Sequence, residues 1–592
     1  MDKYYTLQEA SELKGLSVRR LQQLCTQQKI KSATKINGMW MISDLDDIPA
    51  RERNRRGAAR LPIGLSYEEA CREALVIDKS LLIRDILFSQ AKTILFTRPR
   101  RFGKSMNLDM LKCFFEKNHP ERDDLFDDKA ISKYQTIMST HHMKYNVISL
   151  SFLGMDTDAE GVAERVGYAV YEQYRVHKDV LEIDQETKDF FDELRKPKCP
   201  LSYIERSLRE LIFAFKEPVI VLIDEYDAPI QYGYLHGEYE KVLSFFRNFL
   251  SLALKDHPNC KLAILSGVTR LAKESVFSGF NSAKTNGVDS MEFSTYFGFT
   301  EKETKELFKK VGGMKHYEEA KRYYDGFRFG LEKVFNPWSI ANYINSGYVP
   351  DYYWSNTSNN ALIEASFDTD DPLIDDSLLI LLEGKPLKGV YISEDFSFGD
   401  LEGMPTAIWS LLVSSGYLSV DEERNVIIPN LEARHCFEDR ILARINGESY
   451  HGHQRDFVIA LENNDIRKIE AILSNFIKDS VSNLLAYKEE FYHGLFLGMI
   501  AFASKGYEIK TEYEAGLGRS DIILLPKDER PSIVVEIKRL LSATGEELKK
   551  ESEKAIHQII DRGYIPSNCD AIIYGIAFCK KEFHIESEIK TK

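Results

Sequence analysis

The chain has 592 residues, of which 43% are hydrophobic and 29% are charged. At roughly 100–200 residues per domain this length predicts three or four domains, and the composition excludes a disordered or a fibrous protein. No apolar run approaches the roughly 18–20 residues of a membrane span, and the N-terminus lacks a signal-peptide pattern, so we expect a cytoplasmic protein that makes no membrane contact. The net charge of −14 repels DNA at long range, so contacts with nucleic acid have to come from local patches.

Residues 1–50 predict a small unit of two helices and a ribbon. The runs at 6–14 and 18–28 have the spacing of two short helices joined by a turn, and 35–46 predicts a two-stranded ribbon. This layout resembles the winged helix-turn-helix readers of the MerR/excisionase type. The resemblance implies that Arg19 and Arg20, at the start of the second helix, contact DNA. The alternative is a small protein-docking domain with a solvated helix.

The rest of the chain predicts a multidomain α/β protein. A charged run at 51–60 predicts a linker, and 61–345 alternates helical stretches with β-rich apolar runs that fit a parallel sheet covered on both faces. The strands are expected at 93–97, 146–152, 218–223 and 262–268. Residues 346–480 suggest a helical, winged-helix-like lid and a polar helical bridge, and 481–592 suggest a second α/β unit.

The first expected strand runs into RPRRFGKSMNL, where a Walker A loop would end in Gly-Lys-Ser before a helix. In such a loop backbone N–H groups cradle phosphate, the lysine neutralises the β- and γ-phosphates, and the serine hydroxyl ligates Mg²⁺. We therefore expect ATP to bind Arg98, Pro99, Arg100, Arg101, Phe102, Gly103, Lys104, Ser105 and Met106. Arg98 stands where the full motif has its first glycine, so a helix capped by a basic residue is the alternative interpretation.

The apolar run PVIVLIDEYDAP predicts a buried strand that ends in two carboxylates, Asp224 and Glu225. Burying such a pair is costly unless a cation or a base role uses it, as in a Walker B motif. Asp224 would hold Mg²⁺ together with Ser105, and Glu225 would polarise the attacking water. The alternative is a salt-bridge cluster with Arg100 or Arg101.

The strand LAILSGVTR ends in polar residues, Ser266, Thr269 and Arg270. ATPases of the AAA-like class keep a sensor of the γ-phosphate at this place, and we expect Thr269 and Arg270 to contact the nucleotide. The alternative is an ordinary polar strand end. An arginine finger supplied by a second subunit would imply a homo-oligomer, and Arg270, Arg322 and Arg328 are its candidates.

Six motifs occur in a characteristic order: IDKS (77–80), TRPRRFGKS, LIDEYDAP, SGVTR, YYDGFRFG (323–330) and FNPWSI (335–340). Together they resemble the bacterial AAA-ATPase-like family, whose members typically end in a PD-(D/E)XK nuclease-superfamily domain. The resemblance extends over roughly 61–592 and implies that an arginine at 98 belongs to the family's own loop. Asp78 and Lys79 match a recurring family motif, although by themselves they would be a surface pair.

In the C-terminal part, Asp521 opens the run DIILL, and Glu536 and Lys538 lie two apart on VVEIK, so their side chains share one face of a strand. A solvated strand with alternating charges would give the same pattern. The order helix, three strands, helix, strand and the strings FYHG, GLGRSD, VEIKR and AIHQI resemble the nuclease domain of this family. That resemblance assigns the metal, Mg²⁺ or Mn²⁺, to Asp521 and Glu536, catalytic roles to these residues and Lys538, and support to Gln558.

Glu490 or His493 on the preceding helix is a further candidate metal ligand or phosphate-orienting group, with a structural role as the alternative. We therefore predict a Mg²⁺-dependent, ATP-binding NTPase coupled to a nuclease that cleaves nucleic acid, DNA being favoured over RNA, in defence or mobile-element biology. The alternative is a nucleotide-switched DNA-binding regulator that carries an inactive nuclease fold.

Overall fold

The computed structural model describes residues 4–14, 21–22, 25, 30–36, 39–47, 60–178, 181, 184–270, 283–354, 372–382, 384–393, 405–437, 450–480, 489–500, 506–515, 518–527, 530–565 and 570–591. The chain divides into two compact units: Met1–Ser366, Val390–Arg424 and Pro429–Glu432 form the first, and Phe367–Gly389, Asn425–Ile428 and Ala433–Lys592 the second. The segment 346–480, expected to be a lid and a bridge, is thus shared between them. No helix within these ranges is both long and apolar enough to cross a membrane.

Among its described residues, the N-terminal part of the first unit contains a three-stranded antiparallel sheet, the helix α1 and a 3₁₀ helix. Its elements are β1 (Tyr5–Thr6), α1 (Leu7–Lys14), β2 (Ala33–Ile36), β3 (Met39–Ile42) and the 3₁₀ helix η1 (Leu45–Asp47). The strand order β1-β3-β2 confirms the expected ribbon and adds β1, which is too short to leave a pattern. Arg19 and Arg20 lie outside the described residues, so the DNA-reading helix stays a prediction.

A five-stranded parallel sheet forms the centre of the first unit. Its strands, in the order β5-β6-β7-β4-β8, are β4 (Thr93–Thr97), β5 (Asn146–Ser151), β6 (Val219–Asp224), β7 (Cys260–Gly267) and β8 (Ala283–Asn286). The four expected strands are confirmed, because runs such as TILFT are buried along their whole length. The edge strand β8 was not predicted, since its sequence AKTN carries no apolar run.

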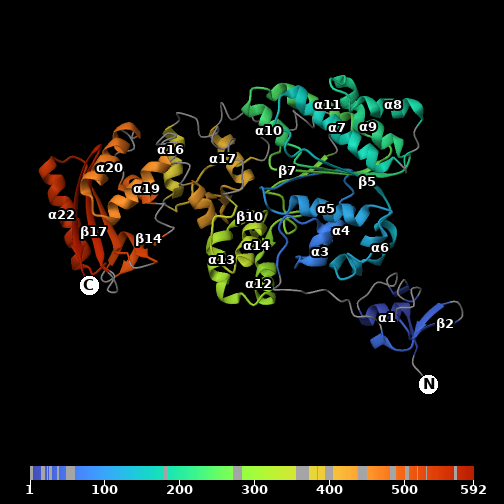
Figure 1. The fold of residues 1–592 in the computed structure, drawn as a ribbon, viewed down its shortest axis with the longest axis horizontal. Helices are drawn as coiled ribbons and strands as arrows, with labels where there is room; N and C mark the ends of the chain where they lie inside the picture. Colours follow the sequence, from blue (N-terminus) through green and yellow to red (C-terminus); the bar gives the residue numbers. More distant parts are fainter. Residues whose placement is uncertain are drawn as a thin grey trace. The chain divides into compact units, whose positions relative to one another are not determined.

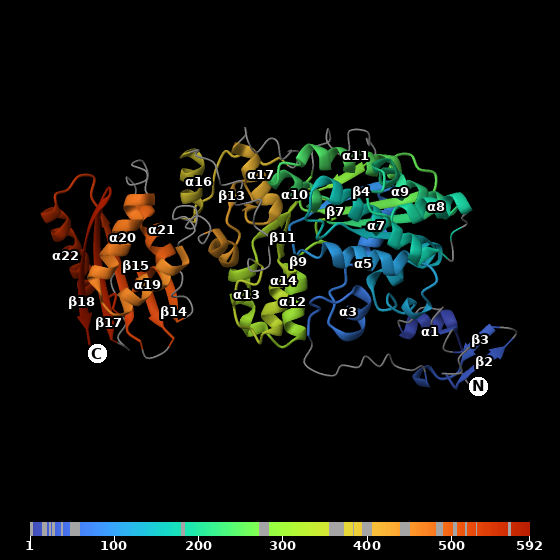
Figure 2. The ribbon, with the colours of Figure 1, turned by 45° about the horizontal axis from the view of Figure 1, so that its top comes forward.

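Helices cover both faces of this sheet. They are α3 (Tyr67–Glu73), α4 (Leu81–Phe88), α5 (Lys104–Phe115), α6 (Gln135–His141), α7 (Ala159–His177), α8 (Gln185–Glu193), α9 (Leu201–Ala214), α10 (Ala228–Leu235) and α11 (Tyr239–Leu254), with η2 (Pro120–Arg122) and η3 (Ala130–Lys133). Figures 1 and 2 show α5 on one face and α7, α9 and α11 on the other. The carboxyl ends of the parallel strands therefore stay open for a site.

A helical subdomain follows the sheet in the first unit. It contains β9 (Phe299–Thr300), α12 (Glu301–Lys310), η4 (Met314–His316), α13 (Tyr317–Tyr324), β10 (Phe327–Phe329), β11 (Glu332–Phe335) and α14 (Pro337–Asn345), followed later by α17 (Pro405–Ser415) and β12 (Ser419–Val420). In the motif YYDGFRFG, Gly326 has φ +92° and a Cβ there would lie 2.0 Å from the Pro429 carbonyl oxygen. This motif therefore requires glycine for a close backbone approach.

The second unit is built around a mixed sheet with strand order β14-β15-β16-β17-β18, in which only the β16–β17 pair is parallel. Its elements are α16 (Pro372–Leu382), β13 (Val426–Ile427), α19 (Tyr450–Glu462), α20 (Ile466–Ser480), α21 (Glu489–Ile500), β14 (Tyr507–Ala515), β15 (Gly518–Pro526), β16 (Ser532–Arg539), α22 (Gly545–Asp561), β17 (Ala571–Cys579) and β18 (Glu582–Lys590). The expected order from α21 to β17 is confirmed.

The expected polar bridge at 455–480 is part of the core of the second unit. Its helices α19 and α20 bury Phe457 and Leu473 in the same apolar cluster as Phe496 of α21 and Ile522 of β15. The bridge appeared polar because the solvent-facing residues of an amphipathic helix outnumber the buried ones. The C-terminal unit therefore begins well before residue 481.

Candidate functional sites

The first site begins where β4 ends and α5 starts. Gly103, with φ +85°, occupies the position before α5, a left-handed conformation that glycine adopts without strain. Lys104 follows and is only 4% exposed. Its Nζ donates to the carbonyl oxygens of Arg98 and Pro99, both at 3.1 Å. The lysine thus holds the loop closed around its own ammonium group.

Two carboxylates at the end of β6 meet this loop. Ser105 Oγ donates to Asp224 Oδ2 at 2.5 Å, and the Ser266 hydroxyl donates to Asp224 Oδ1. Lys104 Nζ lies 3.8 Å from Glu225 Oε1. These contacts form because β6 pairs with β7 and β7 with β4, so that the three strand ends lie side by side at one edge of the sheet.

Glu225 is held in an unusual conformation beside the lysine. Its φ of +52° is rare for a residue with a side chain. Burial raises the pKa of Glu225, and the nearby Lys104 ammonium partly opposes this rise. A carboxylate with a raised pKa is suited to accept a proton near neutral pH.

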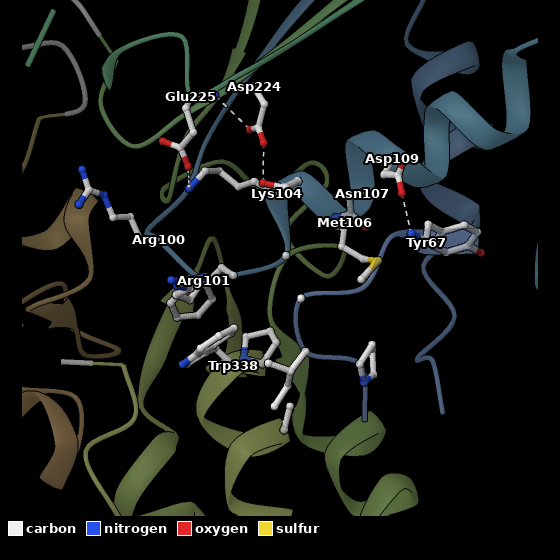
Figure 3. Close-up of a pocket in the computed structure, with 18 of the residues that line it drawn as sticks. Tyr67, Arg100, Arg101, Lys104, Met106, Asn107, Asp109, Asp224, Glu225 and Trp338 are labelled. Carbon is white, nitrogen blue, oxygen red and sulfur yellow. Dashed lines mark hydrogen bonds and ion pairs between the residues drawn. The ribbon is translucent and has the colours of Figure 1, made fainter. Parts of the chain in front are cut away.

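A cavity of about 750 Å³ opens beside these residues, within the range typical of small-molecule sites. The loop residues Arg100 to Met106 and the carboxylates of Asp224 and Glu225 form its polar side. Figure 3 shows the loop and these carboxylates with Tyr67 and Trp338 around the cavity. Its apolar side is lined by Leu61, Pro62, Ile63, Leu65, Tyr67, Leu75, Val76, Ile77, Met110, Phe299, Pro337, Trp338 and Ala341, among others.

The donor set of this cavity suits Mg²⁺ and a phosphate chain. Adjacent oxygen ligands of an octahedral Mg²⁺ lie about 3.0 Å apart when each Mg–O distance is about 2.1 Å. Ser105 Oγ and Asp224 Oδ2 lie next to each other, 2.5 Å apart in their hydrogen bond, and would have to separate slightly to take two adjacent positions around the ion. Backbone N–H groups at the start of α5 could bind phosphate oxygens.

Arg98 and Pro99 do not line the cavity. Arg98 is completely buried: its Nη1 donates to the carbonyl oxygens of Thr97 and Asn286 at 2.8 and 2.7 Å, and its guanidinium lies over the rings of Phe297 and Phe329. The arginine that replaces the first Walker A glycine therefore fastens the loop to β8. Only its carbonyl oxygen faces the loop, toward Lys104.

Thr269 and Arg270 do not line the cavity either. Thr269 is fully buried, and its hydroxyl and backbone N–H both donate to Asp227 Oδ2 at 2.7 Å. The expected contact of Thr269 with the nucleotide does not fit this position, because Asp227 holds its side chain in the core. Ser266 is the residue of this strand that reaches Asp224.

Two further residues support the site: the sequence analysis missed Asp227 and left Lys79 without a functional role. Asp227 is fully buried and also accepts from Val268 N–H at 3.0 Å and from the Gln231 amide at 2.8 Å. Lys79 is not part of a surface pair, as its sequence suggested: it lines the cavity and donates to Glu303 at 2.6 and 2.7 Å. Both residues lie in motifs that the sequence analysis names, Lys79 in IDKS and Asp227 in LIDEYDAP. The contacts that these residues make are visible only in the fold.

The second site lies on β15, β16 and α22. Asp521 Oδ2 accepts from the Ile537 N–H at 2.8 Å, which joins the two strands at the site. Glu536 Oε1 accepts from Lys538 Nζ at 2.8 Å and from the Gln558 amide. The structure thus brings together all four residues that the resemblance assigned to this site.

The surroundings of Glu536 would suit a cation. It is 1% exposed, and its Oε2 is buried without a hydrogen-bond partner among the described residues. Burial, together with the charge of Asp521, raises the pKa of Glu536. A buried carboxylate oxygen with no donor is costly unless a metal ion approaches it, so the pair formed by Asp521 and Glu536 fits Mg²⁺.

The helix α21 adds one group to the second site. His493 Nε2 lies 3.5 Å from Asp521 Oδ2, whereas the side chain of Glu490 lies outside what the structure describes. Within the described ranges, no three His, Cys, Asp or Glu side chains form a preassembled metal cluster. A metal at this site would therefore take its remaining ligands from water and from substrate phosphates, as Mg²⁺ commonly does.

Comparisons with known proteins match two segments of the chain, each of which contains one of the two sites. Residues 62–277 match the family model "Predicted AAA-ATPase", and residues 487–588 match that of the PD-(D/E)XK nuclease superfamily. A protein of Azotobacter chroococcum mcd 1, named "Uncharacterized protein in vnfD 5'region", is 24% identical over 535 residues, which cover 85% of this chain and 93% of that protein. Lys104 and Asp224 lie in the first matched segment, and Asp521 and Glu536 in the second.

Proposed function

We propose that this chain is an ATP-binding, Mg²⁺-dependent NTPase coupled to a nuclease that cleaves nucleic acid, with DNA as the favoured substrate. The observation that carries the proposal is the hydrogen bond between Ser105 and Asp224. In sites that bind Mg²⁺–ATP, the serine that follows a Gly-Lys pair lies next to the acidic residue at the end of a buried strand, and both hold the ion. A role in defence or in a mobile element would suit this combination of domains.

In the first site each residue would have its own role in ATP hydrolysis. Ser105 and Asp224 would hold Mg²⁺, which when bound neutralises phosphate charge and orients the β- and γ-phosphates. Lys104 adds positive charge on the same phosphates. Glu225 orients the attacking water and takes up its proton, for which its raised pKa is suited.

In the second site Asp521 and Glu536 would hold Mg²⁺ or Mn²⁺, which when bound lowers the pKa of a water molecule and stabilises the charge on the scissile phosphate. Lys538 orients the attacking water, and the Gln558 amide fixes one oxygen of Glu536 so that the other faces the cation. The N-terminal unit would tether the DNA.

Incubation of plasmid, single-stranded DNA and RNA with the purified protein, with Mg²⁺ or Mn²⁺ and with or without ATP, tests the proposal. We expect metal-dependent cleavage that Glu536→Ala abolishes, and ATP hydrolysis that Lys104→Ala reduces by about 10²–10³-fold. If wild type and Glu536→Ala both leave every substrate intact, while DNA binding responds to ATP, the chain is a nucleotide-switched regulator instead. If Lys104→Ala retains full ATP turnover, the phosphate-site assignment is wrong.

A further inference from the structure

Three arginines of the phosphate loop have three different environments. Arg98 is buried in the core, as described above. The Arg101 guanidinium lies 4.1 Å from the centre of the Trp338 ring. Arg100 turns toward α10, where its Nη2 lies 3.4 Å from Gln231 Oε1. Figure 3 shows Arg100 on the side of the cavity where Glu225 and Lys104 lie, and Arg101 beside Trp338.

Gln231 fixes the direction in which Arg100 points. The Gln231 amide nitrogen donates to Asp227 Oδ2 at 2.8 Å inside the core, which leaves the amide oxygen directed at Arg100. Gln231 is only 7% exposed and Asp227 is fully buried, so this support is rigid. Both Arg100 and Gln231 line the cavity.

Arg100 also acts electrostatically on the residue beside the reaction centre. Arg100, Lys104 and Glu225 all line the cavity, and Figure 3 shows them on the same side of it. Arg100 is therefore close enough to Glu225 for their charges to interact. Two cations, Lys104 and Arg100, accompany the carboxylate that would orient the attacking water.

ATP hydrolysis needs such a cation at the γ-phosphate. The water oxygen forms a bond to the γ-phosphorus, the bond from that phosphorus to the bridging oxygen breaks with its electron pair leaving on ADP, and a water proton passes to Glu225. Negative charge spreads over the γ-phosphate oxygens in the transition state, and an arginine finger there accelerates hydrolysis by roughly 10³–10⁵-fold.

We propose that Arg100 is an arginine finger that the chain supplies to its own active site, so that hydrolysis needs no second subunit. This inference rests on the proposed NTPase function. The three arginines that the sequence offered as fingers, Arg270, Arg322 and Arg328, do not line the cavity. Arg328 is engaged by the Leu331 carbonyl oxygen at 3.2 Å and by Glu422 at 3.4 Å.

Turnover measurements on full-length variants test the proposal. Arg100→Ala should lower kcat by about 10³-fold or more, and Arg100→Lys should recover part of it, because lysine keeps the charge and loses the planar fork. Arg195→Ala, an exposed arginine distant in sequence, should leave turnover unchanged. A kcat of Arg100→Ala within a few-fold of wild type would overturn the proposal.

Mixing two inactive variants separates a finger in the same subunit from one supplied by a partner. Lys104→Ala retains Arg100, and Arg100→Ala retains the lysine. If the arginine acted in a neighbouring subunit, the mixture would regain activity; we expect no gain above the sum of the two. Turnover per subunit of wild type should also stay constant on dilution. Recovery on mixing, or loss on dilution, would refute the proposal.

Nucleotide binding gives a readout that does not depend on turnover. By calorimetry, Arg100→Ala should weaken binding of a non-hydrolysable ATP analogue by roughly tenfold and leave ADP binding unchanged, since only the γ-phosphate is contacted. Equal weakening for ADP, or none for the analogue, contradicts the inference. Absence of both binding and turnover in the wild type would instead refute the proposed function, whereas Lys104-dependent turnover that survives Arg100→Ala refutes only the finger.

Discussion

The two sites contain the same chemical pair, a glutamate largely shielded from solvent beside a lysine, assembled in two different ways. In the first unit Lys104 and Glu225 come from an α5–β6 contact and lie 3.8 Å apart. In the second unit Glu536 and Lys538 are two residues apart on β16 and lie 2.8 Å apart. The second pair is fixed by one strand, whereas the first depends on the register of three parallel strands. Removal of the lysine should therefore disturb the fold in the first pair more than in the second.

The largest expected effect is a loss of nucleic-acid cleavage without a loss of ATP hydrolysis. Asp521→Ala should lower metal-dependent cleavage by at least about 10³-fold, because a metal ligand is worth several kcal/mol of transition-state stabilisation. ATP turnover should remain at the wild-type level, which a coupled phosphate-release assay measures. Glu508→Ala, an exposed carboxylate on β14, is the matched control. Cleavage that survives Asp521→Ala would place the nuclease chemistry elsewhere.

Replacing each lysine by alanine tests how strongly the fold around each Glu–Lys pair depends on the lysine. Lys104→Ala should reduce ATP turnover by about 10²–10³-fold, as expected for the loss of a donor to the developing charge, and should also lower the melting temperature because two loop carbonyls lose their donor. Lys538→Ala should reduce cleavage by a similar factor with little change in melting. Equal changes in the melting temperatures of the two variants would contradict the predicted difference between the two pairs.

Neutralising the glutamates should stabilise the protein while it inactivates each site. Because burial raises the pKa of Glu225 and Glu536 in the folded state, ionisation of either one at pH 8 costs folding free energy. Glu225→Gln and Glu536→Gln should raise the melting temperature at pH 8, by about 2–4 °C per kcal/mol of relief. This gain should vanish below about pH 4, where the carboxyl is protonated in both states. A variant less stable than wild type at pH 8 would contradict this prediction.

The smallest effect concerns backbone packing at the second site. A Cβ on Gly575 of β17, which pairs with Glu536, would lie 2.1 Å from the Ser552 carbonyl oxygen of α22. Gly575→Ala should thus destabilise the unit by roughly 1–3 kcal/mol and displace Gln558. At Gly545 a Cβ meets nothing within 4 Å, so Gly545→Ala is the control. Chemical denaturation measures both.

Much of the fold follows from local patterns. The central strands were recognised because each is a buried apolar run, and the order of elements in the C-terminal unit followed from strand and helix periodicities. The edge strand β8 and the short β1 were missed, because neither has a periodic apolar pattern. The role of α19 and α20 was misjudged, since a polar exterior does not reveal what the opposite face packs against.

The sequence by itself determined the local parts of the sites. Gly103 is next to Lys104 in the sequence, and Glu536 is two residues from Lys538. Once the local helix and strand form, residues at these spacings lie close together whatever the rest of the fold. The tertiary structure alone decided which side chains face the cavity. Arg98 lies in the core, Thr269 is bound to Asp227, Lys79 reaches Glu303 and Arg100 reaches Gln231. The physical reason is that these contacts join residues far apart in sequence, and their geometry depends on the register and packing of parallel strands that no local pattern records.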